Sequence, residues 1–159
     1  MNNIYENNNK PVTCAMVLAD KDGSILACHA TGRPSDRGYD FPKGIREPGE
    51  SDLEAAKREL YEETGIVFDT YPWAGSVQDL GTHYHNRYKD IHIFMCPVTE
   101  FPDVSGLVCR SYFERNGAEI PEMDGHRVIK KGERNLLNHV LQDKFELIDS
   151  ALHDFHNEK

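Results

Sequence analysis

The stretch spanning residues 41–66, FPKGIREPGESDLEAAKRELYEETGI, constrains the fold more than any other part of the chain. It opens with a loop in which Pro and Gly recur and interrupt regular structure. Ser51, followed three residues later by Glu54, forms the pattern of a capping box, so a helix is predicted to begin at Asp52. Gly65 suits the left-handed position that ends a helix. The stretch therefore predicts a loop followed by a helix of about three turns.

The predicted helix carries three carboxylates on one face. Glu59, Glu62 and Glu63 are related by i,i+3 and i,i+4 spacings, which bring side chains together on a helix. They repel one another and lie near the helix C-terminus, where the macrodipole disfavours negative charge. A cation would offset this cost, and all-oxygen ligands suit Mg²⁺ first or Mn²⁺. The alternative is an ordinary solvated face, the usual state of a Glu-rich helix. An apolar stripe runs beside the carboxylates: Leu53, Ala56 and Leu60.

The joint spacing of the stretch points to a known family. Gly44 is followed after five residues by Glu50, and after seven more by the run 58–66, REL-Y-EE-T-GI. Ordinary residue frequencies make this combination rarer than about 10⁻⁸ per starting position. At these residues the chain resembles the signature of the Nudix hydrolases. The resemblance implies an α/β/α sandwich with a mixed central sheet, a catalytic loop and helix, and hydrolysis of nucleoside diphosphate derivatives with a divalent metal.

Metal chemistry at a phosphoanhydride assigns roles to the glutamates. A cation neutralises phosphate charge and acidifies a bound water, so Glu59 and Glu63 are predicted as principal metal ligands. Glu62 shares or bridges, and Glu62 and Glu63 are both catalytic candidates. The family resemblance adds the backbone carbonyl of Gly44 as a further ligand.

Cationic side chains near the signature have two predicted uses. By resemblance, Arg58 pairs with Glu50 and braces the loop against the helix. Lys43 is a candidate point charge for a substrate phosphate. Arg33 and Arg37, in the polar loop before the signature, are weaker candidates for the same contact, because loop charges are usually solvated.

A second resemblance lies near residue 122. The segment 121–128, PEMDGHRV, is similar to one in bacterial RNA 5′-pyrophosphohydrolases, where the glutamate of the Pro-Glu pair is a further metal-linked catalytic residue. That match assigns Glu122 as general base or extra metal ligand; the alternative is an ordinary loop carboxylate. This chain differs from that group at His126 and Val128, where the group carries aromatics, and at Lys43, where it carries Gln.

These patterns favour Mg²⁺-dependent cleavage of a nucleoside polyphosphate. The run 42–44, PKG, also resembles dinucleoside polyphosphate hydrolases and mRNA-decapping Nudix enzymes, so the expected substrate is a dinucleoside polyphosphate or an RNA 5′ end. The alternatives are an ADP-ribose or nucleotide-sugar pyrophosphatase and a Nudix-fold module that senses a nucleotide without cleaving it. Tyr84 and Tyr88 are candidates to stack on a base, although aromatic strand residues more often pack in the core.

Length, charge and cysteine usage bound the remaining possibilities. The 159 residues suffice for one domain, expected over 11–159, after a polar N-terminal tail over 1–10 that is expected to be mobile. A net charge of −9 disfavours duplex nucleic acid and anionic membranes as partners. Neither a signal peptide nor a membrane-spanning run is expected, so reduced cysteines and a cytoplasmic location are predicted. The oligomeric state is left open.

Periodicity predicts the other elements. Strands are expected over 11–18 and 24–30, around 73–77, over 80–85 and 91–97, and over 107–114 before a turn at Asn116-Gly117. Apolar residues at helical spacing from Arg134 to Phe155 predict a long amphipathic helix.

Overall fold

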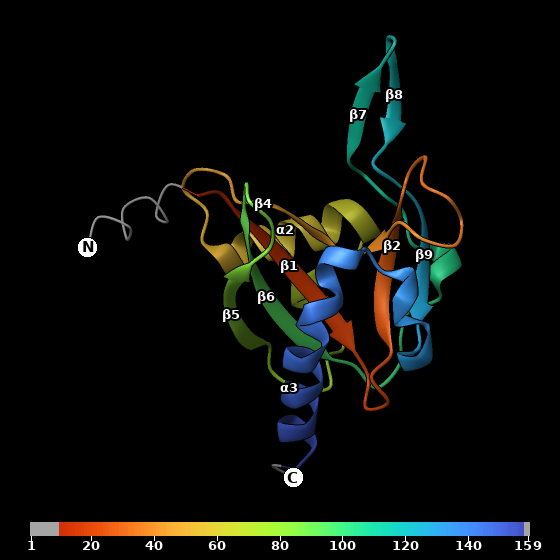
Figure 1. The fold of residues 1–159 in the computed structure, drawn as a ribbon. Coiled ribbons are helices and arrows are strands. Elements are labelled where there is room, and N and C mark those ends of the chain that lie inside the picture. The colour runs from red at the N-terminus through yellow and green to blue at the C-terminus, as the bar shows by residue number, and fades with distance from the viewer. Residues whose placement is uncertain (1–9, 158–159) are drawn as a thin grey trace, which may run out of the picture.

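The computed structural model describes residues 10–157, so the expected mobile tail lies, apart from Lys10, outside the described residues. In that range a seven-stranded sheet forms the centre of the molecule (Figure 1). Its strand order is β3-β2-β1-β6-β5, with β4 paired to β1 and β9 paired to β2. The strands are β1 (Val12–Ala19), β2 (Ile25–Ala30), β3 (Tyr39–Asp40), β4 (Lys43–Ile45), β5 (Gln78–Tyr84), β6 (Asp90–Pro97) and β9 (Met123–Ile129). β1 and β6 run parallel, whereas the other pairs are antiparallel, so the sheet is mixed as predicted.

β1 is buried on both faces, and its sequence explains how the core is divided. Ala15, Val17 and Ala19 contribute to one hydrophobic cluster, and the alternate residues Cys14, Met16 and Leu18 contribute to the other. Side chains of a strand alternate between its two faces, so a nearly continuous apolar run requires a cover on each side. The prediction of a strand near 11–18 is confirmed.

Two helices provide these covers (Figure 1). α2 (Asp52–Thr64) packs Ala55, Ala56 and Leu60 against one face of the sheet. α3 (Phe145–Asn157) packs Ile148 and Leu152 against the other. The predicted α/β/α sandwich is therefore the observed architecture. Among residues 10–157 there is no helix with the length and apolar character needed to span a membrane.

α2 follows its sequence pattern at both ends. The Ser51 hydroxyl accepts from the Glu54 amide, and the Glu54 carboxylate accepts from the Ser51 amide, which completes the predicted capping box. Gly65 ends the helix with φ 83°, a left-handed conformation that glycine adopts without steric cost.

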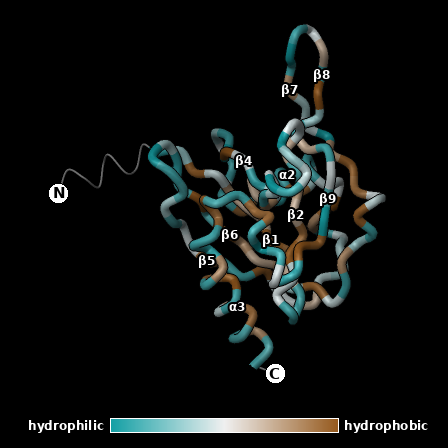
Figure 2. The backbone as a smooth tube through the Cα atoms, turned by 45° about the vertical axis from the view of Figure 1, so that its right-hand side comes forward, coloured by the Kyte–Doolittle hydropathy of each residue, from teal (hydrophilic) through white to brown (hydrophobic). Residues whose placement is uncertain are grey.

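A separate hairpin, β7 (Tyr112–Arg115) and β8 (Ala118–Pro121), stands away from the sandwich (Figures 1 and 2). Asn116 and Gly117 form its turn with φ values of 53° and 81°, as the Asn-Gly pair predicts. The hairpin joins the body beside Glu122, the catalytic candidate between β8 and β9.

Two predicted strands were wrong in place or extent. Residues 73–77 form no strand; the Trp73 ring packs against Phe68 and Tyr71, and its indole N–H donates to the Phe68 carbonyl. Residues 107–111 are irregular, and β7 begins only at Tyr112. The Val108 amide donates instead to the Thr64 carbonyl at the end of α2, so a helix end takes the hydrogen bond that a strand would have used.

The prediction of one long C-terminal helix was wrong, because the segment is interrupted, but the residues on its buried side were predicted correctly. Two short 3₁₀ helices, Lys131–Leu136 and His139–Lys144, precede α3. Leu137 is extended between them, because it bridges Tyr39 of β3. The apolar residues of the pattern still reach the core: Leu137, Leu141, Phe145, Ile148 and Leu152. Two further 3₁₀ helices lie at Phe68–Thr70 and Val104–Gly106.

Candidate active site

Two of the three predicted glutamates are buried on α2. Glu59 is 8% exposed and Glu63 is 2% exposed, whereas Glu62 is half-buried. The Glu63 carboxylate accepts from the backbone amide of Lys43 at 3.4 Å, which ties the helix to β4. A glutamate on a solvated face would not be buried in this way, so the alternative of an ordinary Glu-rich helix face is excluded for Glu59 and Glu63.

Gly44 makes room for the Glu59 carboxylate. A Cβ atom at position 44 would overlap the carboxylate carbon and both oxygens of Glu59. Gly44 is paired with Cys14 of β1, so its backbone cannot move without disturbing the central sheet. The glycine therefore lets the backbone of β4 and a carboxylate of α2 approach closely, as a shared site for one ligand requires.

Burial raises the pKa of both the Glu59 and the Glu63 carboxyl group. Desolvation raises the pKa of Glu59 to about 7, with Glu62 adding to the shift and the Arg58 guanidinium opposing it; Glu122 adds a smaller contribution. Desolvation and the neighbouring charge of Glu59 raise the pKa of Glu63 to about 9. Ionising both groups therefore needs an added positive charge.

Arg58 links the loop to the helix. Its Nε and Nη2 donate to the two carboxylate oxygens of Glu50 at 2.6 and 3.0 Å, and Nη2 also donates to the Ile45 carbonyl at 3.2 Å. Its Nη1 donates to Glu59 at 2.7 Å and to Glu62 at 3.2 Å. The pairing of Arg58 with Glu50 that the sequence suggested is present, and one guanidinium spans both ends of the motif.

Glu122 reaches this region from a distant segment. It lies between β8 and β9, and its carboxylate accepts from the Ser111 hydroxyl at 3.1 Å. Its charge is close enough to contribute to the raised pKa of Glu59. The structure thus brings Glu122 within electrostatic range of Glu59, although its side-chain hydrogen bond is with Ser111.

Lys43 lies beside the site but is already paired. Its Nζ is 3.2 Å from the Asp40 carboxylate, and both side chains are 15% exposed. Burial lowers the pKa of Lys43, but Asp40, Glu63 and Glu59 together raise it above its ordinary value. Lys43 is therefore cationic, and its charge is shared among these carboxylates.

The remaining predicted substrate contacts are not gathered at the carboxylates. Arg37 lies 3.6 Å from its neighbour Asp36, and the rings of Tyr84 and Tyr88 lie under the cations of Lys10 and Arg87. Tyr84 and Tyr88 are exposed and do not pack in the core. Within residues 10–157, these side chains and Arg33 make no hydrogen bond or ion pair to Glu59, Glu62, Glu63 or Glu122.

Several supporting residues escaped the sequence reasoning. The Arg110 amide donates to the Glu62 carbonyl at 2.5 Å, and a His126 ring nitrogen lies 2.7 Å from the Glu63 carbonyl. Asp40 and Ser111 hold Lys43 and Glu122. His126 stood out as a difference from the RNA pyrophosphohydrolase pattern. Arg110 and Ser111 had no local pattern, because their partners are distant in sequence, and the i,i+3 pair of Asp40 with Lys43 was not recognised.

The donor set fits a hard divalent cation. Carboxylate oxygens of Glu59, Glu62 and Glu63 and the nearby Gly44 carbonyl are the ligand types that such ions prefer. The burial of Glu59 and Glu63 and the raised pKa of each show that positive charge would be stabilising here. No group of three His, Cys, Asp or Glu side chains within residues 10–157 is already in coordinating geometry, and Arg58 holds two of the carboxylates.

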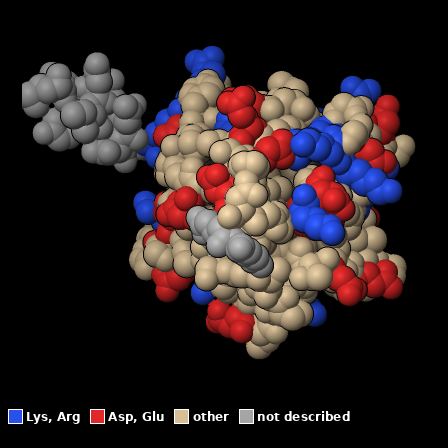
Figure 3. Space-filling model, turned by 90° about the horizontal axis from the view of Figure 1, so that it is seen from below, with Lys and Arg blue, Asp and Glu red and all other residues tan. Residues whose placement is uncertain are grey.

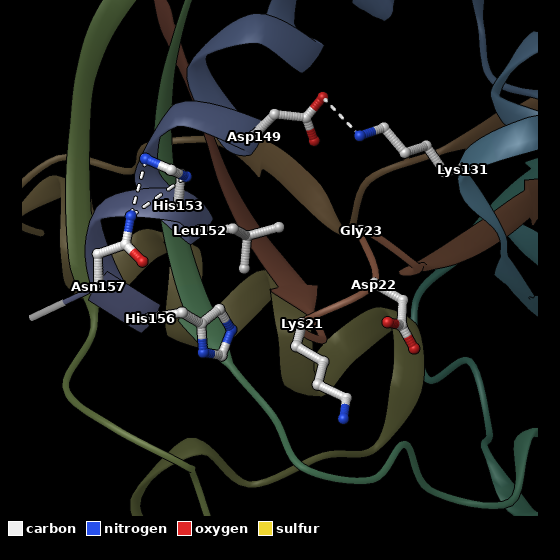
Figure 4. A pocket seen from close by; sticks show the side chains of 9 residues that line it. All are labelled: Lys21, Asp22, Gly23, Lys131, Asp149, Leu152, His153, His156 and Asn157. Atoms are coloured by element: carbon white, nitrogen blue, oxygen red, sulfur yellow. Dashed lines mark hydrogen bonds and ion pairs between the residues drawn. The ribbon is translucent and has the colours of Figure 1, made fainter. Parts of the chain in front are cut away.

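A hollow of about 640 Å³ lies elsewhere, between the β1–β2 turn and α3 (Figure 4). Lys21, Lys131, His153 and His156 line it, but Asp149 in its wall pairs with Arg134 and lies 4.0 Å from Lys131. The face seen from below carries both signs of charge (Figure 3). None of the predicted site residues lines this hollow.

The fold and the site define a sandwich in which α2 and the loop before it carry the carboxylates. The model of the NUDIX domain matches residues 9–119, more than half of the chain, and the chain belongs to the Nudix family. A curated relative, an RNA pyrophosphohydrolase of Erythrobacter litoralis (strain HTCC2594), is 39% identical over 57 residues. That match covers 35% of this chain and 35% of the relative, about a third of its length.

Solved structures agree on the fold. The NUDIX domain of Shewanella oneidensis NrtR, in complex with ADP ribose, has a TM-score of 0.62 and 15% identity, covering 90% of this chain and 88% of that one. A C. elegans Ap4A hydrolase has a TM-score of 0.56 and 16% identity, with 91% and 96% covered. A MutT/nudix family protein from Enterococcus faecalis has a TM-score of 0.53 and 18% identity, and the match covers 77% of this chain but 44% of that protein.

Proposed function

We propose that this protein hydrolyses a phosphoanhydride bond of a nucleoside polyphosphate with the help of Mg²⁺. The observation that carries the proposal is the burial of Glu59 and Glu63 beside Gly44, with the pKa of each carboxyl raised. Buried carboxylates that cannot both ionise alone favour a bound cation, and a cation so held is suited to polyphosphate chemistry.

Each side chain has a distinct part in this reaction. Glu59, Glu62, Glu63 and the Gly44 carbonyl would hold Mg²⁺, which when bound neutralises phosphate charge and acidifies water. Arg58 keeps the loop and the helix in register through Glu50. Glu122 accepts the proton of the attacking water, with Ser111 fixing its carboxylate.

The preferred substrate is a dinucleoside polyphosphate or an RNA 5′ end. The PKG run and the segment at 121–128 support it, as do the activities for which the Erythrobacter litoralis and C. elegans relatives are named. Lys43, Arg33 and Arg37 are proposed phosphate contacts, and Tyr84 and Tyr88 are proposed stacking residues. We place the activity in the cytoplasm.

A substrate panel tests this proposal. Diadenosine tetraphosphate, a 5′-triphosphorylated RNA, ATP, FAD and ADP-ribose are each incubated with the protein and Mg²⁺, or with chelator, and the products are identified by mass. Cleavage at a phosphoanhydride that stops with chelator is expected. If no member of the panel is cleaved at any Mg²⁺ concentration, the proposed activity is wrong.

ADP-ribose is the second candidate substrate, because the NrtR domain was solved with that molecule. A module that only binds it has no need for buried carboxylates together with Arg58 and Glu122, so cleavage is favoured over sensing. AMP and ribose 5-phosphate as the main products would favour this candidate, whereas binding of ADP-ribose without products would indicate a sensor.

A further inference from the structure

The projecting β7–β8 hairpin has two chemically different faces. Cross-strand partners share a face, so Phe113 lies with Ile120, and Arg115 lies with Ala118. The opposite face carries the pairs Tyr112 with Pro121 and Glu114 with Glu119. All the acidic side chains of β7 and β8 are therefore on one face, and the other combines an aromatic ring with a guanidinium.

The aromatic face continues from the candidate active site. The Glu122 amide donates to the Ser111 carbonyl at 2.9 Å, and the Ser111 hydroxyl donates to the Glu122 carboxylate at 3.1 Å, so this pair extends the hairpin ladder by one step. Ser111 is two residues before Phe113, and Glu122 is two residues after Ile120, which puts all four on the same face. The surface thus leads outward from Glu122.

Its side chains suit a nucleobase. The Arg115 guanidinium lies 5.1 Å from the centre of the Phe113 ring, and Arg115 is exposed. Aromatic rings and guanidinium planes are the surfaces on which bases stack, and the guanidinium also attracts phosphate. At about 3.3 Å per residue, Phe113 lies about 7 Å and Arg115 about 13 Å from the Ser111–Glu122 pair, within reach of a nucleoside whose phosphates lie there.

We propose that Phe113 and Arg115 form a platform that binds a nucleobase of the substrate beyond the scissile phosphate. The proposal rests on the function proposed above and adds a specificity-determining surface to it. The positive charge and aromatic ring on this face, and its continuity with Glu122, favour a nucleotide over an acidic or apolar protein partner.

Phe113→Ala tests the platform, and Tyr112→Ala is the matched control, because it removes an aromatic from the same strand but the opposite face. Binding of diadenosine tetraphosphate and of inorganic tripolyphosphate, which has no base, is measured by calorimetry at 4 °C with Ca²⁺ in place of Mg²⁺. Phe113→Ala should weaken diadenosine tetraphosphate binding on the order of 10-fold and leave tripolyphosphate unchanged. Tyr112→Ala should change neither, and Arg115→Gln should weaken both modestly.

Several results would overturn the platform. One is an equal loss of diadenosine tetraphosphate affinity in the Phe113→Ala and Tyr112→Ala variants. Another is a loss of tripolyphosphate affinity on Phe113→Ala that equals the loss for diadenosine tetraphosphate. A further one is a monomer–dimer change with Phe113→Ala in sedimentation, which would assign the face to a second copy. Wild-type protein that binds no nucleotide would do the same. If Phe113→Ala selectively weakens nucleotide binding but wild type releases no product with Mg²⁺, the platform stands and the hydrolase proposal falls.

The same variants distinguish the substrate types that could supply the nucleobase. ATP and a 5′-triphosphorylated pentaribonucleotide are compared with diadenosine tetraphosphate, and the probe with the largest loss on Phe113→Ala identifies the substrate type. An effect on all three supports a platform for any nucleobase. Cleavage by wild type with no effect of Phe113→Ala on any probe leaves the proposed function intact and overturns the platform.

Discussion

At position 44, the absence of a side chain is what allows Glu59 to reach the loop. Gly44→Ala puts a methyl group into the space of the Glu59 carboxylate, so we expect turnover to fall on the order of 100-fold and Mg²⁺ affinity to weaken. Gly132→Ala is the control, since a Cβ there meets nothing within 4 Å. Steady-state kinetics and Mg²⁺ titration make the comparison. Equal behaviour of the two variants would show that Gly44 has no special role.

Glu63 and Glu122 can be separated by their effects on metal. Glu63 is buried on α2, so Glu63→Gln should weaken Mg²⁺ binding directly, and part of the lost rate should return at high Mg²⁺. Glu122→Gln keeps the shape but removes the proton acceptor. Turnover should then fall on the order of 10²–10⁴-fold, with metal affinity in the absence of substrate little changed.

Calorimetric Mg²⁺ titration and turnover measured over a range of Mg²⁺ concentrations distinguish these outcomes. If Glu122→Gln behaves like Glu63→Gln, Glu122 is a metal ligand. If its turnover stays within a few-fold of wild type, the base is one of the helix glutamates.

At the scale of the element, Arg58 joins the loop and α2 through Glu50. Arg58→Ala leaves Glu50 without its bidentate partner and leaves Glu59 and Glu62 without a shared cation. Because the pair is partly exposed, we expect a loss of about 1–2 kcal/mol in unfolding free energy, together with lower turnover. Chemical denaturation and steady-state kinetics measure the two effects.

Lys57→Ala is the control for the Arg58 substitution, because Lys57 contacts only the exposed Asp69 among the carboxylates of the described chain. It should stay within about 0.5 kcal/mol of wild type, as surface substitutions usually do. An equally small effect of Arg58→Ala would show that Arg58 is only a solvated charge on the helix.

The elements that the sequence predicted well are those fixed by local chemistry. The capping box at Ser51, the left-handed Gly65 and the Asn116-Gly117 turn each need only residues close in sequence. The failures came from contacts between distant segments. Val108 bonds to the end of α2, and Leu137 bridges β3, so neither continues the element that its periodicity favoured.

The same distinction applies to the site within the whole molecule. The spacing of the glutamates and of Gly44 is a local pattern, and it is enough to mark one helix face and one loop. Ser111 and His126 approach that face only because the segment before β7 and strand β9 are brought to it by the fold. We expect substrate choice to depend on such non-local surfaces, because the helix signature is local.

The whole molecule should respond to pH and metal through Glu59 and Glu63. Both have folded-state pKa values raised above 4.5, to about 7 and about 9. Their contribution to stability is fully present below pH 4.5 and is lost as the pH rises through these values. The Tm of the metal-free protein should therefore fall between pH 5 and pH 9.

Bound Mg²⁺ reverses this trend, because it stabilises the ionised carboxylates and competes with their protons. At Mg²⁺ about 100-fold above its Kd, linkage adds about 2.7 kcal/mol, which for a chain of this length raises the Tm by about 5–10 °C. The gain should be larger at pH 8 than at pH 6. Scanning calorimetry with chelator and with Mg²⁺ at both pH values measures it, and Glu63→Gln should show a flatter pH dependence and a smaller metal effect. A Tm that Mg²⁺ leaves unchanged at pH 8 would mean that these carboxylates do not hold the metal.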